Sequence, residues 1–383
     1  MTVTQINFSA PLADASNYPP VRIRVSPMQP WSFSRLALQQ QPVLAQSQFF
    51  HSGRGALYFA AKALATATDN VVLLPAYHCP ALVEPFIAAG YQIRFYPLAA
   101  DLSIEPVQLS ELLTFDVTHC LVVRYFGNSL NTDQVLAQLS SRGIVTFDDC
   151  AHDLKTFLQH PLHASARICS LKKFIASADG GLLQLQKPVK AELESHGLWR
   201  ESKNLLGLVR QQISERLSDS ANSRLYPSTP HDAAISASTV MSTSQSGNSG
   251  LRYLTAIHQG TSSYFASGWQ LRCTDTAATF ACRQQHARFL HAELQKSPLG
   301  RLLWSELPAD SALYVVPFLL DDSAGFDLLR RRGLQVLRWE ELAPSTCQVS
   351  AIFRSRLIQL PCHQELTTEQ LADIVHAMQA TPG

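Results

Sequence analysis

Residues 170–181 read Ser-Leu-Lys-Lys-Phe-Ile-Ala-Ser-Ala-Asp-Gly-Gly, with two lysines beside an apolar run and an acidic turn after it. A lysine held among apolar neighbours loses hydration, which lowers its pKa. Such an amine can attack a carbonyl group and form a Schiff base. The two glycines allow backbone angles that other residues resist, so the chain can turn sharply there. Taken alone, the stretch is also compatible with a surface lysine pair before an ordinary turn.

The preceding residues 143–152 (GIVTFDDCAH) read as a buried parallel strand that ends in two carboxylates, Asp148 and Asp149. In open α/β sheets, ligands bind beyond the carboxyl ends of the strands. An aspartate at that place can pair with a pyridinium nitrogen, as pyridoxal phosphate requires. Asp149 precedes Lys173 by 24 residues (173 − 149), which leaves room for a crossover between two strand ends.

Residues 149–152 (DCAH), followed by Lys173 and residues 179–181 (DGG), resemble the DegT/StrS-type aminotransferases, which are fold type I pyridoxal-phosphate enzymes. The resemblance extends over residues 50–185 and, more loosely, over the C-terminal part of the chain. Three further stretches resemble signatures of that family: residues 52–57 (SGRGAL), 73–80 (LLPAYHCP) and 360–366 (LPCHQEL).

The resemblance implies a role for each matched position. Lys173 would hold the cofactor as a Schiff base and then carry protons between carbon centres. Asp149 would keep the ring nitrogen protonated, and His152 would lie near the ring hydroxyl. The cofactor phosphate would bind the backbone around Gly53 and Arg54, at a helix start whose free N–H groups attract anions.

The choice within each pair of neighbours also follows the family pattern. The family lysine precedes the acidic residue of the turn by about six positions, which is the spacing from Lys173 to Asp179 (179 − 173), so we prefer Lys173 to Lys172. The family acid stands immediately before the small pair ahead of the histidine, so we prefer Asp149 to Asp148.

Two positions depart from the family pattern or stay open. The family often has a phosphate-binding serine five positions before the lysine, whereas Ser170 is three positions before Lys173. An aromatic side chain that stacks on the cofactor ring is expected from Tyr77 or His78, and the sequence does not decide between them. A structural aromatic is the competing interpretation of both residues.

The implied reaction is transfer of an amino group from glutamate or glutamine to a keto acceptor. The resemblance suggests a keto-sugar nucleotide, in polysaccharide or secondary-metabolite biosynthesis, and a homodimer with active sites at its interface. Relatives that catalyse dehydration typically replace the lysine with histidine, and Lys173 argues against that reaction. A non-catalytic or regulatory fold type I scaffold that binds a ligand or partner is the alternative.

Composition and charge argue against several other classes of protein. The chain has 383 residues, of which 46% are hydrophobic, and a formal net charge of +1. No basic face is therefore expected, and no nucleic-acid partner. No apolar run approaches the roughly 20 residues of a membrane-spanning helix. The first residues lack the basic start and apolar run of a signal peptide, so we expect a cytoplasmic protein.

The eight cysteines form no Cys-x-x-Cys pair, and their spacings match no zinc ligand set. We therefore expect buried free thiols and no metal site.

Strands that alternate with helices predict βαβ units and a mostly parallel sheet. We expect an α/β fold with a large domain of the fold type I class, a seven-stranded-type sheet, and a smaller α+β C-terminal domain. The expected divisions are a proline-rich extended arm at 1–50, a large cofactor-binding domain at 51–245 and a small domain at 246–383. Residues 218–250 are rich in Ser, Thr, Ala and Asn and predict a mobile segment, either an active-site loop that orders with substrate or a disordered linker.

Local signals predict several elements. Ser52 is expected to cap a helix that continues to residue 65. A single long helix is expected over 268–291 and a strand over 333–339. Thr367 and Gln370 form a capping-box pattern at the start of the last helix.

Overall fold

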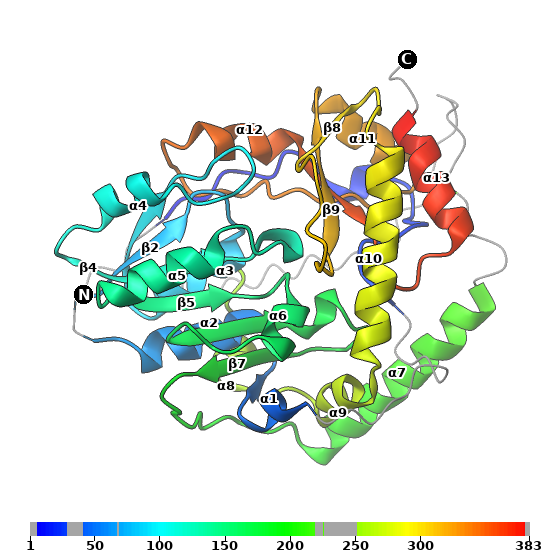
Figure 1. The fold of residues 1–383 in the computed structure, drawn as a ribbon. Helices are drawn as coiled ribbons and strands as arrows, with labels where there is room; N and C mark the ends of the chain where they lie inside the picture. The colour runs from blue at the N-terminus through cyan, green and yellow to red at the C-terminus, as the bar shows by residue number, and fades with distance from the viewer. Residues whose placement is uncertain (1–5, 29–40, 67–68, 219–224, 226–250, 380–383) are drawn as a thin grey trace.

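The large sheet contains seven strands within the part of the chain that the structure describes. This computed structural model describes residues 6–28, 41–66, 69–218, 225 and 251–379. The strand order is β1-β7-β6-β5-β4-β2-β3, and helices cover the sheet (Figure 1). The strands are β1 (Gln48–Phe50), β2 (Val71–Pro75), β3 (Gln92–Tyr96), β4 (Val117–Val123), β5 (Val145–Asp149), β6 (Ala166–Ser170) and β7 (Gly181–Leu185).

The sheet is mostly parallel, which confirms the predicted fold class. β3, β2, β4, β5 and β6 pair in parallel, whereas β7 runs antiparallel to β6 and β1 antiparallel to β7. β2 and β7 are buried along their whole length, as expected of strands covered on both faces. Because β4, β5 and β6 run parallel, their carboxyl ends meet at one edge of the sheet, where the candidate site lies.

The helices that follow the strands in this part of the chain begin at recognisable signals. Ser52 caps α2 as predicted, because its side chain accepts a hydrogen bond from the Gly55 N–H. Pro80 stands at the first position of α3, where its missing N–H costs nothing. The helices are α1 (Pro42–Ala45), α2 (Gly53–Ala63), α3 (Pro80–Ala88), α4 (Pro106–Leu112), α5 (Thr132–Ser141) and α6 (Leu154–Gln159), with 3-10 turns η1 (Ala15–Asn17), η3 (Tyr125–Gly127) and η4 (Leu171–Lys173).

A second, antiparallel sheet has the order β10-β9-β8, with α10 running beside β9 and α13 (Figure 1). Its strands are β8 (Gly300–Leu302), β9 (Val315–Leu320) and β10 (Leu357–Pro361). The remaining helices are α7 (Leu198–Ser218), α8 (Ala256–Gly260), α9 (Phe265–Cys273), α10 (Thr276–Glu293), α11 (Ala324–Arg331), α12 (Gln348–Arg356) and α13 (Thr368–Gln379). At the start of α13, Thr367 and Gln370 make both hydrogen bonds of the predicted capping box.

Two predicted elements differ from the structure. The single helix expected over 268–291 is wrong, because the chain breaks between α9 and α10. Asp275 caps α10 there by accepting a hydrogen bond from the Ala278 N–H at 3.0 Å. The strand expected over 333–339 is also wrong, since Leu334 and Leu337 make only isolated bridges.

The N-terminal segment is anchored on the C-terminal half of the chain. Ile23 bridges Leu334, and the Val25 N–H donates to Gln335 at 2.9 Å. Residues 48–50 pair with β7 as strand β1, so the last residues of the predicted arm belong to the large sheet. The predicted domain limits remain a prediction, and the segment predicted to be mobile, 218–250, lies almost wholly outside the described residues.

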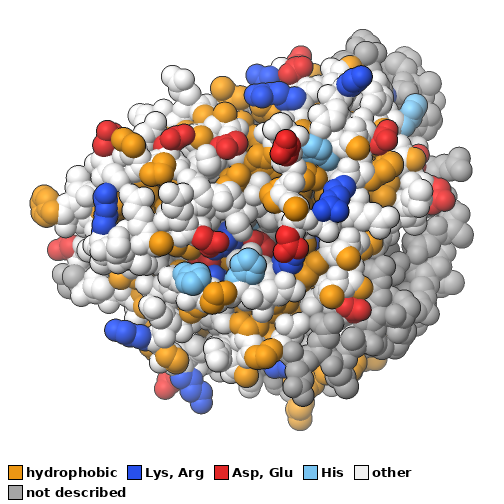
Figure 2. Space-filling model, in the orientation of Figure 1, with side chains coloured by type: hydrophobic (Ala, Val, Ile, Leu, Met, Phe, Trp, Pro, Cys, Tyr) orange, Lys and Arg blue, Asp and Glu red, His pale blue; other side chains and the backbone are white. Residues whose placement is uncertain are grey.

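The visible face in Figure 2 has acidic, basic and apolar side chains interspersed, without a continuous basic stripe. All eight cysteines are free thiols, and six of them are buried. Among the described helices, none combines the length and apolar character that a membrane crossing needs.

Candidate functional site

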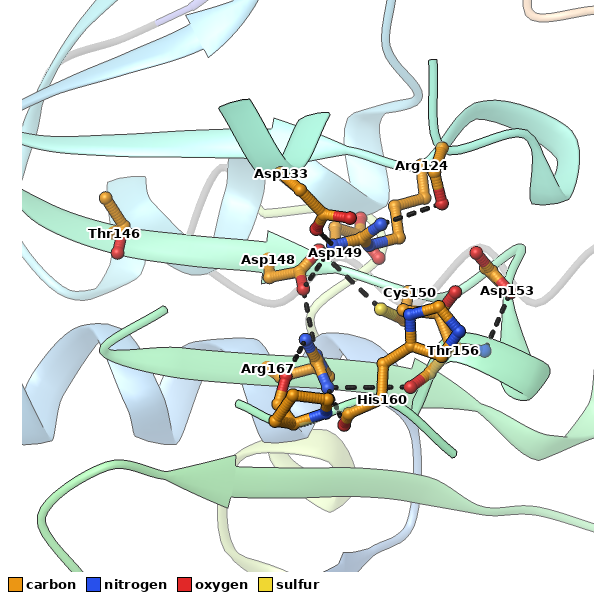
Figure 3. Close-up of polar contacts among 12 residues, drawn as sticks. Arg124, Asp133, Thr146, Asp148, Asp149, Cys150, Asp153, Thr156, His160 and Arg167 are labelled. Atoms are coloured by element: carbon orange, nitrogen blue, oxygen red, sulfur yellow. Dashed lines mark hydrogen bonds and ion pairs between the residues drawn. The ribbon is translucent and has the colours of Figure 1, made fainter. Parts of the chain in front are cut away.

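Two adjacent carboxylates at the end of β5 serve different purposes. Asp148 is fully buried and lies between two guanidinium groups, with Arg124 Nε and Arg167 Nε each 2.8 Å from its oxygens (Figure 3). Successive strand residues point to opposite faces of a sheet, so Asp149 points away from this network. The structure therefore commits Asp148 to structural ion pairs and leaves Asp149 as the carboxylate beside Lys173.

Lys173 and Asp149 are brought together although 24 residues separate them (173 − 149). Burial lowers the pKa of Lys173, and the nearby Asp149 carboxylate partly offsets that effect. Burial likewise raises the pKa of Asp149, and Lys173 opposes this shift. The Ala151 N–H donates to Asp149 Oδ1 at 2.8 Å and orients the carboxyl group. Lys172, in contrast, is exposed.

A corner lined by backbone lies at the start of α2. A Cβ atom on Gly53 would lie 3.5 Å from the Ser170 Cβ, so Ser170 sits beside the first helical turn despite its shortened spacing from Lys173. A Cβ atom on Gly181 would come within 2.2 Å of the Ser52 carbonyl carbon and oxygen, so only glycine permits this approach. The first-turn N–H groups of Gly53 and Arg54 have no intrahelical acceptor and can bind an anion.

The Arg54 side chain does not point freely into this corner. Its Nη1 donates to the Tyr253 carbonyl oxygen at 2.8 Å. Close by, Ser52 Oγ and His258 Nδ1 are 2.9 Å apart, and burial lowers the pKa of His258 to about 4. The segment 253–258 thus packs against the start of α2, and Arg54 contributes positive charge there.

The two residues expected to stack on a cofactor ring, Tyr77 and His78, lie in the core instead. Both are fully buried. The Tyr77 ring is 5.0 Å from that of Trp339, and the His78 ring stacks on Phe95 at 5.1 Å. Neither side chain is free to stack on a cofactor, because the rings of Trp339 and Phe95 pack against them just after β2.

The next residue, Cys79, takes the place near the lysine. Its thiol and the Lys173 amine lie close enough to alter each other's pKa, although burial dominates and raises the pKa of Cys79. Sequence reasoning missed Cys79. The signal was present in the proline that follows it, because Pro80 starts α3 and leaves Cys79 at the turn.

His152 is held between rings near the lysine. It stacks on Phe126 and Tyr314, with ring centroids 5.4 and 5.0 Å apart, and the Lys173 Nζ lies 5.4 Å from the Tyr314 ring centroid. Burial and the Lys173 charge lower the pKa of His152 well below its usual value. The Phe126 N–H donates to its Nδ1 at 3.3 Å, so the neutral ring carries its proton on Nε2. Tyr314 lies far along the chain, and no local pattern marks it.

The C-terminal signature holds the lysine loop. Gln364 Nε2 donates to the Phe174 carbonyl oxygen at 2.9 Å, directly after Lys173. His363, beside it, contacts the Arg24 carbonyl oxygen at 3.0 Å through Nε2. The motif over 360–366 thus links the N-terminal segment to the loop that carries the candidate Schiff-base lysine.

These features fit pyridoxal phosphate. An amine of lowered pKa lies beside a buried carboxylate at the carboxyl end of a parallel strand. The start of α2 lies near this amine and beside Ser170, and the free N–H groups of a helix start suit a phosphate group.

Comparison with known proteins agrees with this arrangement. Residues 47–209 match the model of the DegT/DnrJ/EryC1/StrS aminotransferase family. Protein MosB of Rhizobium meliloti is 30% identical over 147 residues, which cover 37% of this chain and 29% of MosB. The match thus spans less than a third of that relative's length.

Solved structures share the fold. Helicobacter pylori PseC, an aminotransferase involved in the biosynthesis of pseudoaminic acid, has a TM-score of 0.60 at 16% identity over 98% of both chains. The E. coli GDP-4-keto-6-deoxy-D-mannose-3-dehydratase with bound hydrated PLP has a TM-score of 0.63 at 12% identity, over 94% of this chain and 100% of that chain. At such identities the likeness shows the fold alone.

Proposed function

We propose that this chain is a pyridoxal-phosphate-dependent aminotransferase, because residues 47–209 match the model of the DegT/DnrJ/EryC1/StrS aminotransferase family. The observation that carries the proposal is the pairing of the half-buried Lys173 with the buried Asp149 at the carboxyl end of the parallel sheet. A scaffold without catalytic function has no need to keep a lysine of lowered pKa beside a buried acid.

Each residue has a definite part. The Lys173 amine, whose pKa burial lowers, would condense with the cofactor carbonyl, releasing water, and would later move a proton at its Nζ atom. Asp149 would pair with the ring nitrogen and hold a proton there. Gly53, Arg54 and Ser170 would hold the phosphate through backbone N–H groups and a hydroxyl. When bound, the cofactor supplies an electron-accepting ring that stabilises negative charge on the substrate carbon.

The remaining contacts orient the cofactor. His152 Nε2–H is available to donate a hydrogen bond to the ring hydroxyl. Cys79 lies near Lys173, whereas Tyr77 and His78 are enclosed in the core, so a thiol rather than an aromatic side chain would line the cofactor site there.

Glutamate or glutamine is the proposed amino donor, and a keto-sugar nucleotide is the proposed acceptor. The structural neighbours support this acceptor class, because PseC belongs to amino-sugar biosynthesis and the E. coli dehydratase acts on a GDP-linked keto sugar. Lys173 supports amino transfer over dehydration, since dehydrating relatives typically carry histidine at that position.

A homodimer that works in the cytoplasm is part of the proposal. Large apolar side chains on α7 and α9 support self-association, since they face solvent in the single chain. Figure 1 shows α7 at the rim of the molecule. The exposed side chains are Leu198, Trp199, Leu205, Leu206 and Val209 on α7, with Phe265 and Trp269 on α9. An apolar surface of this kind marks an interface.

The absorbance spectrum of the protein reconstituted with pyridoxal phosphate tests the function. We expect a band of lysine-bound cofactor that glutamate converts to the pyridoxamine phosphate form. Lys173→Ala should show neither band nor conversion, whereas Lys172→Ala, which changes an exposed neighbour, should behave as wild type. A wild-type protein without the band would make a ligand-binding scaffold the better interpretation.

A further inference from the structure

A cluster of two histidines and an aspartate lies beside the candidate site and has no part in the proposed reaction. His51, Asp179 and His196 each bring one ligand-type atom within 4.8 Å of the others. His51 Nδ1 lies 3.0 Å and His196 Nε2 3.9 Å from Asp179 Oδ2. The residues come from three segments: the end of β1, the turn before β7 and the segment before α7.

His196 is the unusual member of this cluster. Its side chain is 1% exposed, yet neither ring nitrogen has a hydrogen-bond partner within the described parts of the chain. Its ring stacks on Tyr264 with centroids 3.9 Å apart, which fixes its orientation. A buried polar ring without partners costs stability, so an ordinary His51–Asp179 hydrogen bond does not explain the cluster.

The spacing suits a tetrahedral metal ion. Zinc bonds to nitrogen and carboxylate oxygen of about 2.0–2.2 Å place ligand atoms roughly 3.3–3.5 Å apart. The two separations that involve Asp179 Oδ2, 3.0 and 3.9 Å, lie on either side of that value, and all three ligand atoms lie within 4.8 Å of one another.

The aspartate is already oriented by outer contacts. Ser267 Oγ donates to Asp179 Oδ1 at 2.6 Å, and the Tyr264 N–H donates to Oδ2 at 3.0 Å. Such outer hydrogen bonds to a ligating carboxylate are typical of metal sites. The His51 side chain is 18% exposed, which leaves a path from solvent.

We propose that His51, Asp179 and His196 bind one zinc ion through two imidazoles and one carboxylate. This site revises our expectation that the chain holds no metal. The ion stabilises the junction of three segments, because His51 precedes the Ser52 cap of α2 and Asp179 follows the Lys173 loop. Zinc binding here does not depend on the proposed aminotransferase function.

Zinc binding by the untagged, full-length protein tests the proposal. After dialysis against a chelator, the protein is titrated with zinc sulfate in competition with a zinc-binding dye, with and without pyridoxal phosphate. We expect one zinc ion per chain and a melting temperature that rises with zinc concentration. His196→Ala should lower zinc affinity by more than about 100-fold, and Ser267→Ala by about 10- to 100-fold.

The variants separate a ligand from a packing residue. Without zinc, His196→Ala should be as stable as wild type or more stable, because it removes an unpartnered buried ring. His376→Ala, which changes an exposed histidine of α13, should bind zinc as wild type does. Equal zinc affinity of wild type and His196→Ala, or no zinc uptake by wild type, would overturn the proposal.

Discussion

Arg283 Nη2 of α10 donates a hydrogen bond to the carbonyl oxygen of Lys173 at 3.0 Å. The same guanidinium donates to the carbonyl oxygen of Tyr314 at 3.1 Å and to Gln364 Oε1 at 2.8 Å. It also lies 4.7 Å from the Phe174 ring centroid. One buried arginine thus joins the helix beside the second sheet to the loop that carries the candidate Schiff-base lysine.

Removing this guanidinium should loosen the lysine loop. Arg283→Ala removes the hydrogen bonds to the Lys173 and Tyr314 carbonyl groups and to Gln364 Oε1, so we expect a loss of about 2–4 kcal/mol in the free energy of unfolding, measured by urea denaturation. We also expect about tenfold weaker binding of pyridoxal phosphate, since the loop is less preorganised. Arg288→Ala, on the exposed side of α10, should change stability by less than about 1 kcal/mol. Similar losses in both variants would contradict the assignment.

The two neighbouring carboxylates of β5 should respond in opposite ways to the same substitution. Asp148→Asn removes the carboxylate that Arg124 and Arg167 share. Arg124 still pairs with Asp133, but Arg167 keeps no carboxylate partner within the described residues, so we expect a loss of about 3–5 kcal/mol in unfolding free energy. Asp149→Asn should change stability by about 1 kcal/mol or less, because burial already disfavours its charge. Its rate of amino transfer, however, should fall by more than about 100-fold.

Unfolding curves and single-turnover rates of both variants check this pair. If Asp148→Asn were stable but inactive and Asp149→Asn were active, the catalytic carboxylate would be Asp148 and our assignment would be wrong.

The sequence was sufficient for the architecture and for residues set by local spacing. Alternation of strands and helices predicted the parallel sheet, and the spacing to the acidic turn selected Lys173. Positions that depend on enclosure by distant residues could not be predicted. Tyr77 and His78 stand two residues and one residue before Cys79, and their contacts with the distant rings of Trp339 and Phe95 decide that these two side chains lie in the core.

The zinc cluster illustrates the same limit. His51, Asp179 and His196 lie 128 and 17 residues apart in sequence (179 − 51 and 196 − 179), so no short ligand motif exists. Likewise, the arginines that pair with Asp148 lie on β6 and after β4, and only strand order makes them neighbours.

Two buried histidines should make the protein sensitive to mild acid. Burial lowers the pKa of His78 to about 4 and that of His363 to about 3. In the unfolded chain both bind a proton below about pH 6.5. The unfolded state therefore binds more protons between about pH 6.5 and 4, and stability falls as the pH falls through this window, by about 1.4 kcal/mol per pH unit for each histidine.

Unfolding free energies measured across that window test this linkage. His78→Asn keeps a polar group for the Ala343 N–H but cannot titrate, so its slope should be smaller than that of wild type by one proton. NMR titration of the two imidazoles in the folded protein gives a direct check. A native pKa near 6.5 for either ring would refute the explanation.

The exposed apolar side chains of α7 predict how the chain associates. Trp199 is 78% and Leu206 59% exposed, so burial of both against a second copy would be favourable. We expect the wild-type protein to sediment as a dimer, and the double variant Trp199→Glu/Leu206→Glu to sediment as a monomer, because burying two carboxylates in an apolar interface is costly. Phe115→Glu changes another fully exposed aromatic residue, outside α7, and should remain a dimer. A dimer that persists in the double variant would show that its interface lies elsewhere.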